Sequence, residues 1–130
     1  MARHLIAPEW VIAGYEFPKD VRVTFCDDLR VLSDAEIETG DFIVIPYLQE
    51  RADIQAAIPK MKNVKVIQLL FAGFDHVINH IPDGVTLCNA AGVHDDSTAE
   101  MALTLTLAAQ RELPESVRAQ DKKKWGHYFS

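Results

Sequence analysis

The amino-acid sequence predicts an α/β fold, in which a doubly wound parallel sheet of five strands is followed by a long helix. The first observation is a series of five short apolar runs, rich in β-branched residues, whose starts lie about 20 residues apart. These runs are HLIA (4–7), VRVTF (21–25), FIVI (42–45), VKVIQLL (64–70) and VTLCN (85–89). The second observation is that the runs lack a polar face, which is typical of parallel strands covered by helices on both sides. We expect a flavodoxin-like strand order.

The segments between the runs are predicted to be mainly helical, because most of them have helical spacing or the chemistry of a helix start. They are PEWVIAGYE (8–16), SDAEIET (33–39), LQERADIQAAIPKMK (48–62) and FDHVINHIPDG (74–84). Turn-forming residues separate the elements: Gly40 precedes the third run, Asn63 the fourth and Gly84 the fifth. Strand and helix therefore alternate through the first two thirds of the chain.

The composition is that of one ordinary globular domain. The chain has 130 residues, of which 48% are hydrophobic and 25% are charged, so it is long enough to bury a core. Nineteen acidic residues against thirteen basic ones give a formal net charge of -6. This balance argues against nucleic acid or an anionic membrane as a partner, and we expect neither.

Cysteine usage and hydropathy indicate a cytoplasmic location. Cys26 and Cys88 form no close C-x-x-C pair, so we expect neither a disulfide framework nor a cysteine zinc site. The N-terminal stretch MARHLIAPEW has too short an apolar segment for a signal peptide. No apolar run approaches the roughly 18 residues that a membrane span needs.

Ligands of open parallel sheets bind beyond the carboxyl ends of the strands, near the point where strand order reverses. The most informative loop at that edge is in LLFAGFDHV, where Gly73 lies between a buried strand and a helix that we expect to begin at Asp75. Backbone N–H groups in this loop can bind a carboxylate or a phosphate, with the helix dipole behind them. Alternatively, Gly73 only makes a tight turn between strand and helix.

The stretch HDDSTAE is explained better as a helix start than as a chemical site. Ser97 and Glu100 have the spacing of a capping box, and Asp95 and Asp96 favour the positive end of a helix. His94 and its neighbouring aspartates lack a recognisable metal-ligand spacing. We therefore expect no metal site.

The helix predicted over residues 97–112 is apolar nearly all round. Leu103 and Leu107 share one face, and other apolar side chains occupy the remaining faces. Such a helix is normally buried on every side, which a single five-stranded domain cannot easily provide. We therefore divide the chain into a sheet domain, 1–96, and an interdomain segment, 97–130, and expect a partner subunit or a further domain to pack on the helix.

Two neighbouring stretches of the sequence resemble those of a known protein family. QLLFAGFDHV, followed by LCNAAGVHDDSTAEMALTLTLAAQR, resembles the N-terminal part of the D-isomer-specific 2-hydroxyacid dehydrogenases. The resemblance spans nearly the whole chain, although only residues 66–111 are distinctive. It implies a flavodoxin-like substrate-binding domain, and a helix that crosses into a Rossmann NAD domain and packs between domains and subunits.

The resemblance also implies a substrate site. Residues 72–74 match the family's backbone cradle for the substrate carboxylate, and His94 falls at a position that faces the cleft between domains, although a plain loop histidine is the alternative. The positions assigned to substrate binding are Pro46, Tyr47, Ala72, Gly73, Phe74 and His94. The phosphoglycerate branch would have an arginine near Pro46, and its absence argues against a phosphorylated substrate.

We expect this chain to hold no catalytic residue and no cofactor of its own. Its six glycines form no G-x-G-x-x-G loop, and the family's catalytic arginine, glutamate and histidine have no counterparts here. The complete enzyme would use NAD or NADP to move a hydride to or from a small 2-hydroxy or 2-oxo acid. The chain would then be a substrate-binding domain, whole or as a fragment, and we expect a homodimer or a missing NAD domain packing on the helix.

Two other function classes share this predicted topology. A stand-alone flavodoxin-like module could bind a small carboxylate without catalysis. A phosphoacceptor receiver domain has similar topology and length, but it requires an aspartate at the end of the third strand. FIVIP ends in Pro46 instead, and no acidic pair follows the first strand, so the receiver class is discounted.

Overall fold

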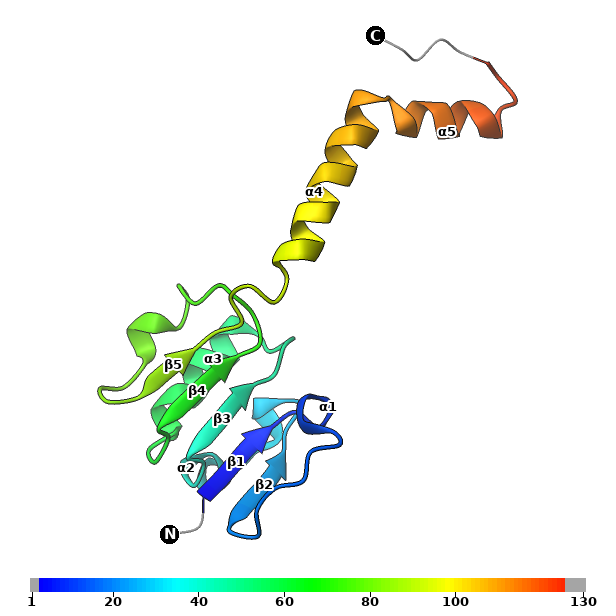
Figure 1. The fold of residues 1–130 in the computed structure, drawn as a ribbon. Helices are drawn as coiled ribbons and strands as arrows, with labels where there is room; N and C mark the ends of the chain where they lie inside the picture. The colour runs from blue at the N-terminus through cyan, green and yellow to red at the C-terminus, as the bar shows by residue number, and fades with distance from the viewer. Residues whose placement is uncertain (1–2, 126–130) are drawn as a thin grey trace. The chain divides into compact units, whose positions relative to one another are not determined.

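In the computed structural model, which describes residues 3–125, five strands form one sheet in the order β2-β1-β3-β4-β5 (Figure 1). All four strand pairings are parallel. The strands are β1 (Arg3–Ala7), β2 (Val21–Phe25), β3 (Phe42–Ile45), β4 (Val66–Leu69) and β5 (Thr86–Cys88). This order and direction confirm the predicted doubly wound α/β fold.

Short helices connect the strands, and two longer ones follow the sheet. The α-helices are α1 (Glu9–Ile12), α2 (Asp34–Glu38), α3 (Arg51–Ala57), α4 (Asp95–Gln110) and α5 (Leu113–Asp121). Three 3₁₀ turns lie between them: η1 (Leu29–Val31), η2 (Ile58–Lys60) and η3 (Ile78–His80). The chain divides into two compact units, Met1–Ala91 and Gly92–Ser130. The first two residues of the predicted domain 1–96 and the last five of the predicted segment 97–130 lie outside the described residues.

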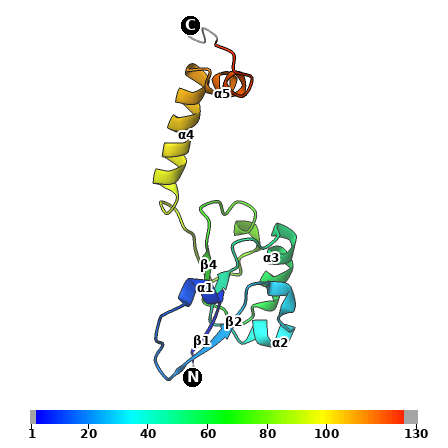
Figure 2. The ribbon, with the colours of Figure 1, turned by 90° about the vertical axis from the view of Figure 1, so that its right-hand side faces the viewer.

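The sheet buries one apolar face under α2 and α3, which lie together on one side of it (Figure 2). Ile6, Ile43 and Ile67 are paired in register across three neighbouring strands, and each is at most 1% exposed. Ile37 of α2 and Ile54 of α3 belong to the same buried cluster. The alternation of side chains along each strand therefore places one isoleucine per strand in the core layer.

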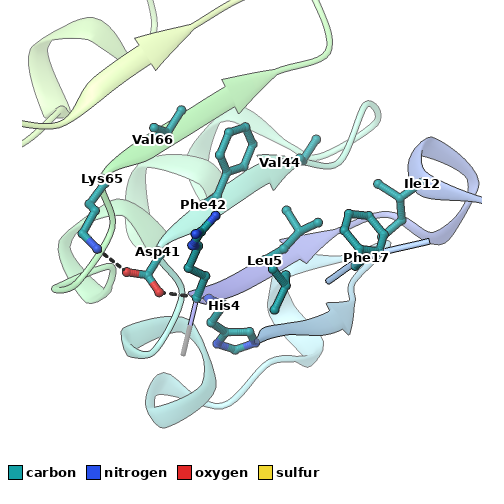
Figure 3. Close-up of a pocket in the computed structure, with 11 residues that line it drawn as sticks. His4, Leu5, Ile12, Phe17, Asp41, Phe42, Val44, Lys65 and Val66 are labelled. Carbon is teal, nitrogen blue, oxygen red and sulfur yellow. Dashed lines mark hydrogen bonds and ion pairs between the residues drawn. The ribbon is translucent and has the colours of Figure 1, made fainter. Parts of the chain in front are cut away.

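The opposite face of the sheet is covered less completely. The four-residue α1 supplies Ile12 there, and Phe17 follows from the connection to β2; together with the strands they line a groove of about 470 Å³ (Figure 3). Its walls are mainly apolar, with Leu5, Phe42 and Val44 on the strands. Helices thus lie on both faces as predicted, but α2 and α3 cover one face more completely than α1 covers the other.

Gly40 is required by packing where α2 leads into β3. A Cβ atom at this position would lie 2.9 Å from Cδ1 of Ile6 and 3.0 Å from Cγ1 of Ile43. Both contacts are shorter than ordinary van der Waals distances. The glycine therefore lets the chain approach the core layer closely, in addition to marking the predicted turn.

A buried histidine joins β1 to its neighbours. His4 is 4% exposed, and its ring lies between the hydroxyl groups of Thr39, 3.1 Å from Nδ1, and Thr24, 2.8 Å from Nε2. Because the Thr39 hydroxyl donates to the carbonyl of Glu36, it can only accept from Nδ1. The neutral ring therefore carries its proton on Nδ1 and accepts from Thr24 at Nε2.

The backbone around His4 is fixed by a charge pair. The His4 N–H donates to Oδ2 of Asp41 at 2.9 Å, and Nζ of Lys65 lies 2.7 Å from Oδ1 (Figure 3). Hydrogen bonding to Lys65, supported by the His4 N–H, holds the pKa of Asp41 below its ordinary value. These contacts hold the amino ends of β1, β3 and β4 together, opposite the edge where ligands are expected.

Candidate functional site

The predicted substrate loops leave adjacent strands at the carboxyl edge of the sheet. Ile45 at the end of β3 pairs with Leu69 at the end of β4, so the loop that begins at Pro46 starts beside the loop that contains Gly73. The loop after β5 adjoins the second of these. The fold thus gathers the predicted positions 46, 47 and 72–74 at one edge.

The segment 72–74 is exposed, and its glycine is not explained by the fold alone. Gly73 does not have a positive φ, and a Cβ atom built on it meets nothing within 4 Å. A tight turn therefore does not require glycine here, and neither does packing within the described residues. The absence of a side chain leaves the backbone here open to close approach by a ligand.

The expected α-helix from Asp75 is wrong. The chain makes a turn and then only the 3₁₀ segment η3, because β-branched residues follow and Pro82 ends the segment. No helix dipole therefore stands behind the loop, and any anion binding there depends on the N–H groups themselves.

Both ends of the loop are anchored. The ring of Phe71 stacks on that of His76, with centroids 5.5 Å apart, and Nε2 of Gln55 donates to the carbonyl of His76 at 2.7 Å. Val77 is fully buried in the core. Residues 72–75 are therefore held as an exposed arch between fixed supports.

The carbonyl groups of this arch are turned toward the chain after β5. The Ala90 N–H donates to the Phe71 carbonyl at 3.1 Å, and Nδ2 of Asn89 donates to the Ala72 carbonyl at 2.8 Å. In a trans peptide the N–H points away from the C=O of the same unit, and there is no cis bond in the described chain. The N–H groups of Ala72 and Gly73 consequently both point away from residues 89–90.

These N–H groups are candidates for binding an anion. Within residues 3–125, no oxygen atom accepts a hydrogen bond from the N–H of Ala72, Gly73 or Phe74. Successive backbone N–H groups with a common direction are suited to carboxylate or phosphate oxygens. The role of the Asn89 side chain was missed from the sequence; an asparagine at a strand end was its only signal.

The loop after β3 is built differently. Pro46 is buried and its carbonyl accepts the Gln49 N–H at 3.2 Å, whereas Tyr47 and Phe74 are 45% and 42% exposed. Gln49 accepts from the Leu29 N–H at 2.7 Å through Oε1. Tyr47 can therefore reach a ligand through its exposed side chain, while Pro46 can do so only by shaping the loop.

An ion pair follows β2 at the same edge. Asp28 accepts two hydrogen bonds from Nε of Arg30 at 3.0 Å and one from Nη2 at 2.7 Å. These contacts, followed by the Arg30 N–H, lower the pKa of Asp28 to about 2. A cavity of about 320 Å³ beside it is lined by Asp27, Asp28 and Glu50 against the single cation of Arg30. The charge of this cavity therefore disfavours the binding of an anion other than Asp28 itself.

The substitution Arg30→Gln is expected to raise the pKa of Asp28 toward the ordinary value of about 3.9. Because the folded-state pKa lies below that of the unfolded chain, the ion pair favours folding above about pH 4, and this contribution is lost as the pH falls toward 2. A carboxyl-carbon NMR titration measures the shift. Lys122→Gln makes the same charge change on the exposed end of the chain and should leave Asp28 unaffected; an unchanged Asp28 titration in Arg30→Gln would refute the assigned cause.

His94 belongs to the second unit, where it is the residue before α4. Its carbonyl accepts the Thr98 N–H at 2.9 Å and the Ser97 hydroxyl at 3.0 Å. The predicted capping box is therefore wrong. The helix begins at Asp95, two residues before the expected start, because Asp95 and Asp96 already favour the first turn, and Ser97 lies inside it.

The helix also ends earlier than predicted. It stops at Gln110, and Glu112 adopts a left-handed conformation with φ 47° before α5 begins. The helix α5 was not predicted within the interdomain segment 97–130; Pro114 in its first turn was the missed signal. Residues 95–110 contain no buried position, and Leu103 and Leu107 are 60% and 55% exposed.

Two features were not found among residues 3–125: a metal-binding cluster and a membrane-spanning helix. Among them, no group of three His, Cys, Asp or Glu side chains is arranged to hold a metal ion. None of their helices is long and apolar enough to cross a membrane. The assignment of the six predicted positions to substrate binding remains a prediction.

Comparison with known proteins identifies relatives among dehydrogenases. No family model matches the chain. A D-3-phosphoglycerate dehydrogenase from Archaeoglobus fulgidus is 40% identical over 74 residues, which is 55% of this chain and 13% of that protein. The solved structure of a D-isomer specific 2-hydroxyacid dehydrogenase family protein from Aeromonas salmonicida matches the whole chain with a TM-score of 0.80 at 18% identity.

The chain spans 43% of that solved structure, and the aligned segment is a small part of the curated relative. The structural match shows a shared fold, and the sequence match adds a common origin. Both agree with the resemblance carried by residues 66–111. The chain is therefore similar in sequence to a D-3-phosphoglycerate dehydrogenase over 74 residues, and it shares the fold of a D-isomer specific 2-hydroxyacid dehydrogenase family protein.

Proposed function

We propose that this chain is the substrate-binding part of an NAD(P)-dependent D-2-hydroxyacid dehydrogenase. The observation that carries the proposal is the segment 72–74 of the exposed arch. The N–H groups of Ala72 and Gly73 both point away from residues 89–90, the N–H groups of residues 72–74 lack acceptors within the described residues, and Gly73 is a glycine that the fold does not require. A carboxylate has two oxygens that can accept such hydrogen bonds, and its charge strengthens them.

The proposed role of this part is to bind and orient the acid. The N–H groups of Ala72 and Gly73 would hold the carboxylate, which fixes the position of the adjacent C2 atom. Tyr47, whose loop starts beside the arch, would contact the rest of the acid. No residue of this chain is assigned to hydride or proton transfer, which is proposed for the complete enzyme alone.

The proposed substrate is a small acid without a phosphate group. The curated relative is named for phosphoglycerate, but the loop after Pro46 offers no arginine before Arg51. The neighbouring cavity carries three carboxylates, and its one guanidinium is already bound by Asp28. The doubly charged phosphate group of a phosphorylated acid would be repelled there.

A dinucleotide does not fit the residues present. Binding of its pyrophosphate needs a glycine-rich loop between a strand and a helix, and the glycines of this chain form no such loop. Isothermal titration calorimetry with NAD and NADP tests whether the cofactor site lies outside this chain. We expect no tight binding of either to the isolated chain; a dissociation constant below about 10 μM would place a cofactor site here and contradict the proposal.

We also propose that α4 packs against the NAD domain or a second subunit in the complete enzyme. Its exposed leucines form an apolar surface of the kind that marks interfaces. The double substitution Leu103→Glu and Leu107→Glu should weaken self-association more than tenfold, because each buried leucine contributes about 1.5–3 kcal/mol. Sedimentation velocity measures the effect. Leu48→Glu alters a leucine that is 89% exposed in the other unit and should not change self-association; equal behaviour of all variants would refute a subunit interface on α4.

A further inference from the structure

The Asn89 side chain holds the orientation of a single peptide unit in the arch. Its Nδ2 donates to the Ala72 carbonyl at 2.8 Å, and its Oδ1 accepts the Ala91 N–H at 3.4 Å. These contacts fix which end of the amide faces the arch, because only the nitrogen can donate and only the oxygen can accept. Asn89 and Ala72 are 17 positions apart in the sequence.

The held carbonyl determines where the neighbouring N–H points. The Ala72 carbonyl and the Gly73 N–H belong to the same planar trans peptide, so a carbonyl turned toward Asn89 turns the N–H away from it. The preceding peptide is held in the same sense by the Ala90 N–H, which is 3.1 Å from the Phe71 carbonyl. Main-chain atoms hold the first peptide, whereas a side chain alone holds the second.

Free rotation of the second peptide would be easy without that side chain. Gly73 has no Cβ atom, and the space around it is open, so little steric resistance opposes a flip of the peptide between Ala72 and Gly73. A flip would replace the N–H donor by a carbonyl oxygen at the place where the anion binds. The exchange would turn an attractive contact into a repulsive one.

We propose that Asn89 is a positioning residue for acid binding: it locks the Ala72–Gly73 peptide so that the Gly73 N–H faces the substrate carboxylate. This inference rests on the proposed function of the arch. It assigns a role to a side chain that is not expected to touch the acid. The positioning role requires the Nδ2 donor of the Asn89 side chain, and the Oδ1 acceptor orients the side-chain amide.

The experiment titrates the isolated chain with glycolate, the smallest 2-hydroxy acid, and follows amide signals by ¹H–¹⁵N NMR. Asn89→Ala removes the lock, and Asn89→Asp keeps the shape but replaces the donor by a carboxylate. We expect glycolate to bind about five- to tenfold more weakly to Asn89→Ala, on the scale of one lost hydrogen bond, and more weakly still to Asn89→Asp. The Gly73 amide should lose its response to glycolate in both.

Gln68→Ala is the matched control. Its side-chain amide also donates to a main-chain carbonyl, that of Leu69 at 2.7 Å, but outside the arch, so glycolate affinity should be unchanged. Hydrogen exchange at the Ile67 amide reports whether each variant keeps a folded core. A purely structural role of Asn89 would speed this exchange and leave the affinity of the folded protein unaltered.

The possible outcomes separate the two proposals. If the unaltered chain shows no response to glycolate at residues 72–74, the proposed acid site is refuted, and the positioning role of Asn89 with it. If the unaltered chain responds and Asn89→Ala binds glycolate equally well, the acid site stands and the role of Asn89 is overturned. Weakened binding in Asn89→Ala but not in Gln68→Ala supports both.

Discussion

Replacing Ile67 by alanine should destabilise the sheet unit by about 3–4 kcal/mol, as is usual for a fully buried isoleucine whose cavity cannot collapse. Ile67 is on β4, is 0% exposed, and is paired in register with Ile43 on one side and Leu87 on the other. Small domains are stable by only about 5–15 kcal/mol. Chemical denaturation followed by circular dichroism should therefore show a large fall in midpoint.

Leu48→Ala provides the control for this prediction. It removes the same type of apolar surface from a side chain that is 89% exposed, so the change in unfolding free energy should stay within about 0.5 kcal/mol. A loss of less than about 1 kcal/mol in Ile67→Ala would mean that the isoleucine layer is not the centre of the core.

Gly73→Asp should weaken acid binding about tenfold or more. The new carboxylate would stand beside the N–H groups proposed to hold the substrate, and two like charges about 4 Å apart repel by about 1 kcal/mol in bulk water and about 4 kcal/mol near a protein surface. The fold should tolerate the change, because φ is not positive at Gly73 and a Cβ atom finds open space. Glycolate titration followed by NMR measures the affinity.

Ala35→Asp adds the same charge at an exposed position of α2. Because α2 leads into the amino end of β3, at the edge of the sheet opposite the arch, we expect glycolate affinity to change less than twofold. Equal affinity in Gly73→Asp and the unaltered chain would remove the arch from consideration as the acid site.

The strands were predictable because each signal is local. The runs 21–25 and 42–45 match β2 and β3 in both bounds, since both are rich in β-branched and aromatic residues. The run 64–70 was predicted too long, because Lys65 at its start pairs with Asp41 outside β4. Apolar character thus located the strands, and side-chain contacts set their ends.

Helix ends were harder, because several start signals compete within a few residues. Ser33 and Glu36 do form a capping box at α2, whereas the same pattern at Ser97 lies inside α4. The aspartates that precede Ser97 stabilise the first turn equally well, so the sequence contains two valid starts. Local pattern alone cannot decide which of them the chain uses.

The candidate site could be placed from topology, but its construction could not. The position of Gly73 beyond β4 follows from the rule for parallel sheets. The contacts made by Asn89 and Gln49 join residues about 20 positions apart, and no periodic pattern records such pairs. Side-chain hydrogen bonds to loop carbonyls depend on the folded backbone, so they appeared only with the structure.

The most direct test of the acid-binding assignment is an amide-resolved NMR titration of the unaltered chain with glycolate. The account predicts saturable shifts concentrated at the N–H groups of Ala72, Gly73 and Phe74, with smaller changes at Tyr47, and no comparable response to uncharged ethylene glycol. Shifts confined to other surfaces, or an equal response to both compounds, would contradict it.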